Sequence, residues 1–239
     1  MHNATMQKTH HLKSIIESDR SPTKQHPMPF VRVELVVLCV VGDRLHVLLS
    51  HREGAPYKGK WGLPGGVLRI DLDGSLEAAA QRVAQERLNM SLPNLDQVAA
   101  VGGADRDPRA PWAMSVVYRS LVQADLGATP GKRVQALAWR NVTDVMQAPD
   151  LAFDHASLVA KAVEETRREV RELRFQTGWL PEEFTLSELQ ALSEAVLAGP
   201  LDKVTFRRRI VASGCAFALE GKMKMSGAHR PAQLYSLAG

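Results

Sequence analysis

The chain of 239 residues contains 30 Lys and Arg against 26 Asp and Glu, with 45% hydrophobic and 23% charged residues. This composition is typical of globular proteins, and it excludes a fibrous repeat or a wholly disordered chain. No apolar run approaches the roughly 18 to 20 residues that a membrane span needs. The length allows one large domain or two smaller ones.

The N-terminal segment has no apolar stretch of signal-peptide length, so nothing directs export. Cys39 and Cys215 are the only cysteines, and they lie far apart, each inside an apolar run. This pattern favours two buried thiols over a disulfide or a metal pair. We therefore expect a cytoplasmic protein.

The charge is distributed unevenly. Residues 203–239 carry seven basic residues against one acidic residue, whereas residues 151–202 carry five against ten. A basic segment beside an acidic one is typical of an element that meets a polyanion such as DNA. The alternative is a solvated basic tail, but the segment also has an apolar periodicity that a tail would lack.

In chain order, residues 1–29 are polar and predict a flexible N-terminal arm. Apolar runs at 30–41 and 45–49, separated by Gly42-Asp43, predict a β-hairpin. A glycine-rich loop follows at 61–66, and the spacing over 75–88 predicts a helix with Ser75 as its N-cap. Further strands are expected at residues 98–102, 113–122 and 136–140. Residues 30–150 therefore predict a mixed α/β domain.

The remainder, residues 151–239, predicts a linker helix and a winged helix-turn-helix domain. A charged amphipathic helix is expected over 154–175, either as a spacer or as a transmitter between domains. Thr185 to Glu188 has the form of a capping box and opens a helix that Gly199-Pro200 stops. A second helix over 203–213 and strands at 216–220 and 233–237 complete the winged-helix order. The expected inner face of that second helix is Val204, Phe206, Ile210 and Val211.

The segment KGKWGLPGG at residues 58–66, with the helix that follows it, resembles the Nudix box region. In that family, carboxylates on one helical face hold divalent cations that activate water for hydrolysis of nucleoside diphosphate derivatives. Arg82 and Glu86 match the box, and Asn89 stands where the box has a glycine, a position at which a left-handed backbone is needed.

The box is incomplete in this chain, because Gly74, Val83 and Arg87 stand where the family has glutamates. The interval before Arg82 is also two residues longer than in the family. The enlarged loop contains Asp71 and Asp73, which are either substitute metal ligands or solvated acids. We expect no metal, no catalytic residues and weak or absent hydrolysis.

Seven further segments resemble the NrtR and NadQ group of Nudix-related transcriptional regulators of NAD metabolism. They are PYKGKW at 56–61, DRDPR at 105–109, AFDH at 152–155, FTLSELQ at 184–190, PLDK at 200–203, FRRR at 206–209 and RPAQLY at 230–235. The resemblance covers residues 30–237. It implies an α/β Nudix-like domain followed by a winged helix-turn-helix domain, in a homodimeric repressor of NAD biosynthesis or salvage genes that binds double-stranded operator DNA. It also implies an effector such as ADP-ribose, NAD or ATP, with no other cofactor.

The candidate site residues fall into two sets. The DNA-binding candidates lie on the second helix and the wing: Lys203, Thr205, Arg207, Arg208, Arg209, Lys222, Lys224, His229 and Arg230. The nucleotide-binding candidates lie around the glycine-rich loop: Arg52, Lys60, Trp61, Gly65, Gly66 and Arg69.

Several candidates have an ordinary structural alternative. Trp61 fits a core position under the loop as well as an adenine platform, and Arg207 fits a partly structural role. Arg106 and Arg109 either touch the ligand or form surface ion pairs. His155 is expected to cap or pack.

Two other functional classes remain open at this point. An active Nudix hydrolase of ADP-ribose or a related compound would use the C-terminal domain for dimerisation or RNA binding. A nucleotide-binding adaptor would have no DNA role at all.

Overall fold

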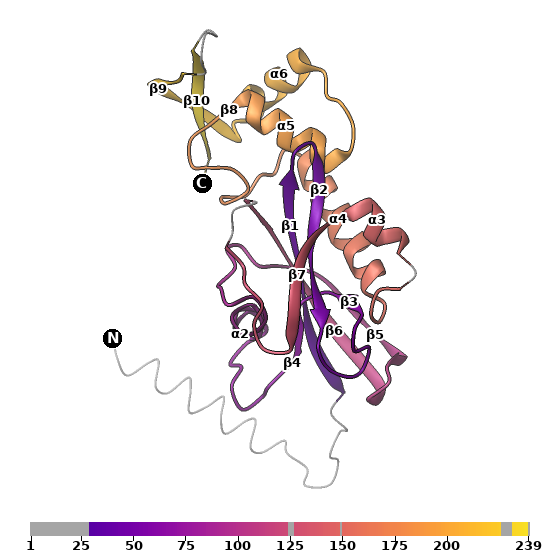
Figure 1. The fold of residues 1–239 in the computed structure, drawn as a ribbon. Helices are drawn as coiled ribbons and strands as arrows, with labels where there is room; N and C mark the ends of the chain where they lie inside the picture. The colour runs from indigo at the N-terminus through magenta and orange to yellow at the C-terminus, as the bar shows by residue number, and fades with distance from the viewer. Residues whose placement is uncertain (1–28, 124–126, 149, 226–230, 239) are drawn as a thin grey trace, which may run out of the picture.

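The computed structural model describes residues 29–123, 127–148, 150–225 and 231–238. Figure 1 shows a central sheet with helices on both faces and a smaller unit of two helices and a short sheet at one end. Among the described residues, no helix has the length and apolarity to cross a membrane. The predicted arm at 1–29 lies almost wholly outside the described residues.

The large sheet has seven strands. They are β1 (Phe30–Val41), β2 (Arg44–Arg52), β3 (Trp61–Gly62), β4 (Gly65–Val67), β5 (Asp96–Asp107), β6 (Ala110–Val122) and β7 (Val134–Asn141). Their order is β3-β2-β1-β6-β5, with β4 paired to β1 and β7 paired to β2. The predicted hairpin is confirmed, since β1 and β2 are antiparallel with Leu38 opposite Val47. Strand β1 also runs parallel to β6 and so lies at the centre of the sheet.

Strand β1 divides its side chains between the two faces of the sheet, as the two-residue period of a strand requires. Val33, Leu35 and Val37 lie in one apolar cluster with helix α2 (Leu76–Leu88). Val36 and Leu38 lie in a second cluster with α3 (Val142–Gln147) and α4 (His155–Arg171). The sheet is therefore covered on both faces.

The two ends of α2 agree with the prediction. The Ser75 hydroxyl accepts a hydrogen bond from the Ala78 amide, and Asn89 closes the helix in the left-handed region with φ 53°. Asn tolerates this conformation better than most residues. The predicted left-handed backbone at Asn89 is thus confirmed.

The helix expected over 154–175 is shorter than predicted, because α4 ends at Arg171. The backbone turns at Leu173, which is buried with φ 57°. A residue in this left-handed conformation cannot continue a right-handed helix. The short helix α3 was not predicted.

The smaller unit consists of β8 (Phe184–Thr185), α5 (Leu186–Leu197), α6 (Lys203–Ser213), β9 (Ala216–Lys224) and β10 (Ala232–Leu237). Its three strands are ordered β8-β10-β9. The predicted capping box is confirmed, since Thr185 and Glu188 exchange both hydrogen bonds. Strand β9 is longer than predicted and includes Lys222 and Lys224.

The predicted inner face of α6 is half wrong. Phe206 and Ile210 are buried, but Val204 is 73% exposed and Val211 is 63% exposed. Phe206 and Ile210 are four residues apart and share a face, whereas Val204 lies two residues before Phe206 and therefore points to the other side of the helix.

The two units share one apolar core. The same cluster contains Val36 and Leu38 from the sheet and Leu189 and Val196 from α5. Figure 1 shows the turn between β1 and β2 reaching α5. The Arg167 side chain on α4 also donates a hydrogen bond to the Val196 carbonyl at 3.0 Å. The connection between the units is therefore a packed interface.

A buried arginine reinforces this interface. Arg119 on β6 has no exposed side-chain surface, and its guanidinium lies 2.7 Å from carboxylate oxygens of both Asp96 and Glu169. It also donates to the Thr166 hydroxyl and lies over the Trp179 ring. Because a buried charge is stable only with partners, these contacts fix α4 and the chain after it against the sheet.

We expect Arg119→Met to lower the free energy of unfolding by about 3–5 kcal/mol, because it leaves the carboxylate of Glu169, which is 12% exposed, without its cation. The matched control is Arg168→Met, which removes an exposed pair with Glu165 and should cost only about 0–1 kcal/mol. Urea unfolding followed by circular dichroism measures both. Equal losses in the two variants would contradict this account of Arg119.

Candidate functional site

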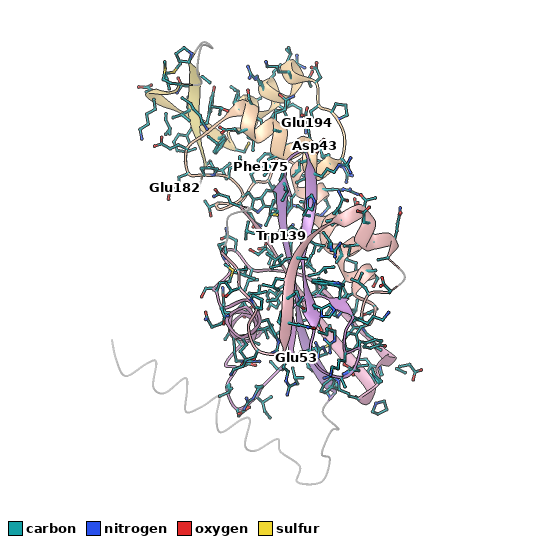
Figure 2. The ribbon with its side chains drawn as sticks, viewed as in Figure 1. Asp43, Glu53, Trp139, Phe175, Glu182 and Glu194 are labelled. Carbon is teal, nitrogen blue, oxygen red and sulfur yellow. The ribbon has the colours of Figure 1, made fainter. Side chains whose placement is uncertain are left out.

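A cavity of about 450 Å³ opens beside the glycine-rich loop. It lies between the start of β1, the end of β2, β4 and the C-terminal part of α2. Five arginines contribute to its lining: Arg32, Arg52, Arg87, Arg109 and Arg133. Among the lining residues only Glu53 is acidic. We refer to it as the arginine cavity; Glu53, one of its lining residues, is labelled in Figure 2.

Two of the five arginines have carboxylate partners. Arg32 pairs with the buried Glu34 at 2.6 Å, and Arg109 pairs with Asp107 at 2.5 Å. In the part of the chain that the structure describes, no ion pair involves Arg52, Arg87 or Arg133. The cavity therefore carries an excess of positive charge, which favours an anionic ligand.

The electrostatics of Arg52 and Arg87 show the same excess. Burial lowers the pKa of Arg52, and the nearby Arg32 lowers it further. Burial also lowers the pKa of Arg87, with added repulsion from Arg133 and Arg32. Both groups still remain cations at neutral pH. A bound anion would relieve this repulsion.

The nucleotide-binding candidates are only partly brought together. Arg52, Gly65 and Gly66 line the arginine cavity, whereas Lys60, Trp61 and Arg69 do not. Arg69 pairs instead with Asp71 at 2.6 Å, and Lys60 is exposed. Trp61 is half-buried against the core, with His51 edge-on at 5.0 Å and Arg140 over its ring.

The two glycines are required by packing inside the protein. A Cβ atom at Gly65 would lie 1.7 Å from Glu34 Oε2, and one at Gly66 would lie 2.7 Å from Val83 Cγ2. The loop backbone thus rests directly on the side chains of β1 and α2. This close approach leaves the other side of the loop facing the cavity.

The residues at the Nudix box positions do not fit a divalent cation. Arg87 donates from Nε to the Gly65 carbonyl at 2.9 Å and from Nη1 to the Lys132 carbonyl at 2.7 Å. Val83 is fully buried in the apolar core. Within the described ranges, no group of three or more His, Cys, Asp or Glu side chains is placed to hold a metal ion.

The two loop aspartates are held by arginines. Asp73 accepts hydrogen bonds from Arg82 at 2.6 and 2.7 Å, and these contacts lower the pKa of its carboxyl group. Asp71 pairs with Arg69, as described above. Glu86 is 3.4 Å from Arg82. Asp71, Asp73 and Glu86 thus each have an arginine partner.

His155 has a structural position next to the cavity. Its Nδ1 accepts the Leu63 amide hydrogen at 2.8 Å, and its Nε2 lies 3.8 Å from Glu34 Oε2. Burial, with the neighbouring Arg32, lowers the pKa of His155 to about 3, so the ring is neutral. The predicted packing role is confirmed, and His155 anchors the glycine-rich loop to the start of α4.

The sequence analysis did not predict that Arg32, Arg87 and Arg133 line the cavity, or that Phe153 lies beside two of its arginines. The Phe153 ring has the guanidinium of Arg32 at 5.4 Å and that of Arg52 at 5.0 Å. Tyr57 packs against the same ring with centroids 4.6 Å apart. One available signal was the charged pair Arg32 and Glu34, which interrupts an otherwise apolar strand.

The two arginines of the 105–109 loop differ in their surroundings. Arg106 forms a bidentate pair with Asp154 at 2.7 Å and donates to the Ser115 hydroxyl. Arg109 pairs with Asp107 but also lines the cavity. Arg106 therefore ties the loop to α4, and Arg109 faces the site.

A second candidate site is the exposed face of α6 with the adjacent strand β9. Arg207 donates to the Ser187 hydroxyl at 3.0 Å, and Arg209 donates to the Arg171 carbonyl at 2.9 Å. Arg208 makes no hydrogen bond or ion pair within the described parts of the chain. The three successive arginines are thus not equivalent.

Besides Arg208, the exposed residues of α6 are Lys203, Val204, Thr205, Arg209, Val211, Ala212 and Ser213. Val204, Arg208 and Val211 follow the spacing i, i+4, i+7 and share one face. On β9, Lys222 pairs with Glu183 and Lys224 pairs with Glu188, both at 2.5 Å. The predicted residues His229 and Arg230 lie outside the described residues.

Comparison with known proteins matches both units. The family model described as NUDIX domain matches residues 31–162, and the model described as NrtR DNA-binding winged helix domain matches residues 177–237. The chain is 34% identical over 213 residues to the "ADPR responsive transcriptional repressor NtrR" of Acinetobacter baylyi, covering 89% of this chain and 84% of the relative.

Two solved structures of NrtR from Shewanella oneidensis are similar to this chain. The structure complexed with a 27mer DNA has 32% identity and a TM-score of 0.74, covering 87% of this chain and 93% of that one. The NUDIX domain complexed with ADP ribose has 31% identity and a TM-score of 0.56, covering 64% of this chain and 98% of that one.

The depressed pKa of His155 predicts a pH effect on stability. The unfolded chain protonates this residue below a pKa of about 6.5, whereas the folded protein does not until about pH 3. The unfolded state therefore binds more protons between these values, and stability falls as the pH is lowered through this window.

We expect His155→Gln to remove up to about 1.4 kcal/mol per pH unit from this slope. Urea unfolding of both proteins at several pH values between 4 and 7.5 measures it. The stability difference between wild type and variant should shrink towards acid pH. Parallel stability curves would show that His155 is protonated equally in both states.

Proposed function

The chain belongs to the NrtR family of Nudix-related transcriptional regulators, and on this basis we propose that it is a DNA-binding repressor controlled by a nucleotide of NAD metabolism. The observation that carries this proposal is the arginine cavity, which lies in a unit that shares its core with a winged helix. We propose genes of NAD biosynthesis or salvage as its targets, and a homodimer as its working form.

We propose ADP-ribose as the effector. The arginine cavity offers guanidinium groups, which bind phosphate oxygens in a bidentate manner. The curated relative is ADP-ribose responsive by its name, and the Nudix domain of the Shewanella protein was crystallised with ADP ribose. NAD and ATP also carry diphosphate groups, and they are the competing candidates.

We propose α6 as the recognition helix and Arg208 as its base-reading residue. Arg208 is free of intramolecular partners among the described residues, whereas Arg207 and Arg209 are held by hydrogen bonds. An arginine in the major groove binds guanine in a bidentate manner, and apolar side chains contact the thymine methyl group. Val204 and Val211 lie beside Arg208 and are suited to such methyl contacts.

The other basic residues are suited to the DNA backbone. Lys203 and Thr205 lie in the first turn of α6, where helix N-termini commonly meet phosphates. Lys222 and Lys224 lie on the wing strand, and we assign them, with His229 and Arg230, to phosphate or minor-groove contacts. Contacts of this kind fix the register of a protein on DNA without selecting sequence.

We also propose that the two functional units are the predicted ones, with residues 30–150 as sensor and 151–239 as linker helix and DNA-binding domain. Helix α4 serves both. Its apolar face packs under the large sheet, and its C-terminal half contacts α5. We propose that α4 transmits a change in the sensor through these packed side chains and is not a passive spacer.

DNA binding is tested by fluorescence anisotropy at fixed salt, with labelled DNA from upstream of the host's NAD-synthesis genes. We expect the protein to bind this DNA more tightly than scrambled DNA. ADP-ribose should change the affinity for the DNA, whereas NAD or ATP at the same concentration should not. Arg208→Ala should cost about 1–3 kcal/mol of discrimination. The control Arg168→Ala, on α4, should bind the DNA as the wild type does. If the protein shows no preference over scrambled DNA, the nucleotide-binding adaptor without a DNA role is favoured instead.

We propose that the chain has no hydrolase activity, because Val83 and Arg87 replace carboxylates that Nudix enzymes use to hold cations. Incubating the protein with ADP-ribose and MgCl2 should release no AMP above the uncatalysed rate. Turnover at ordinary enzyme rates of roughly 1 per second or more would show that the chain is an active hydrolase.

A further inference from the structure

Arg87 occupies the part of the arginine cavity where a Nudix enzyme places a metal-binding carboxylate. Its guanidinium is fixed by two backbone carbonyls, those of Gly65 and Lys132. These carbonyl oxygens are hard donors of the kind that divalent cations bind. Here both oxygens accept N–H groups of Arg87, so the guanidinium places a positive charge against them.

At the position of Arg87 the expected negative charge is replaced by a positive one, and other arginines add to it. A glutamate is replaced by a guanidinium, and Arg52 and Arg133 face the same cavity without a carboxylate partner in the described parts of the chain. The only acidic lining residue, Glu53, is exposed at the rim. A divalent cation entering the cavity would meet three like charges, whereas a diphosphate would meet three counter-charges.

We propose that Arg87, together with Arg52 and Arg133, supplies the positive charge that divalent cations supply in Nudix enzymes, so that this chain binds the diphosphate of its effector without a metal. The inference rests on the proposed function, because it concerns the same ligand and the same cavity. The inference goes beyond the absence of glutamates from the box, since it assigns to Arg87 a role in binding the diphosphate.

The fixed charges have a consequence for regulation. Affinity for the effector is independent of the Mg²⁺ concentration in the cell and falls with ionic strength, because the contacts are ionic. Bound nucleotide also remains chemically intact, since nothing in the cavity activates water as a bound cation would. A sensor that does not consume its signal reports concentration directly.

Calorimetric titration of the full chain with ADP-ribose, in EDTA and in millimolar MgCl2, tests metal independence. We expect dissociation constants equal within about twofold, whereas a requirement for metal would weaken binding in EDTA by about tenfold or more. The latter result would overturn the inference. Absence of binding in both buffers would instead refute the proposed function.

Direct metal binding is tested with Mn²⁺ as the probe, followed by electron paramagnetic resonance of the full chain with and without ADP-ribose. We expect all Mn²⁺ to stay free or bound only to the nucleotide in solution. Mn²⁺ held by the protein in the ternary mixture would overturn the inference.

The role of Arg87 is tested by Arg87→Gln, which keeps an amide N–H donor for the Gly65 or Lys132 carbonyl but removes the charge. Loss of a charge-assisted phosphate contact should weaken ADP-ribose binding by about tenfold or more. The control Arg168→Gln should bind normally, and unchanged affinity of Arg87→Gln would overturn the inference. Arg87→Glu should lose binding that neither Mg²⁺ nor Mn²⁺ restores.

If Arg87→Gln does not fold, Arg133→Gln tests the same charge argument at a second residue of the cavity lining. The Arg133 side chain makes no hydrogen bond among the described residues, so its replacement leaves the scaffold intact. We expect a similar loss of affinity in EDTA and in Mg²⁺. A loss seen only in EDTA would show that metal can replace the arginine charge and would overturn the inference.

Discussion

The buried guanidinium of Arg119 is the interaction on which the relation between the two units depends. Its carboxylate partners, Asp96 and Glu169, come from β5 and α4, and Gln176 beyond α4 donates to Asp96 as well. A charge in the interior is stable only when all these groups are in place. The helix and the chain leading to the winged helix are thereby fixed to the sheet, and the shared apolar core completes the connection.

Carboxylate partners divide the arginines near the glycine-rich loop into two groups. Arg32, Arg82 and Arg109 pair with acids and build the scaffold. Arg52 and Arg87 bond only to backbone carbonyls and keep their charge for the cavity. Arg32 and Arg109 do both, because each pairs with an acid and also lines the cavity. On α6 the arginines differ in another way: Arg207 and Arg209 bond to a hydroxyl and to a backbone carbonyl, whereas Arg208 makes no hydrogen bond among the described residues.

The glycine-rich loop and α2 keep their packing although Val83 and Arg87 stand where the resemblance leads us to expect carboxylates. Gly66 still packs on Val83, and Asn89 still closes α2, so the loop and helix keep their arrangement without the metal-binding carboxylates. Val83 even contributes to the core. The packing of the loop therefore uses Val83, a position at which the resemblance leads us to expect a glutamate.

Local patterns in the sequence determined the hairpin, α2 with its caps, the capping box at Thr185 and the order of the winged helix, since each depends on neighbouring residues alone. The motifs of residues 58–66 and 184–209 also identified the family. Only the tertiary structure decided which cations face the cavity. Arg32, Arg87 and Arg133 are far apart in the chain, and Arg69 forms an ion pair with Asp71 two residues away. The exposure of Val204 and Val211 was likewise decided by how α6 packs, because a short amphipathic pattern leaves the phase of the helix open.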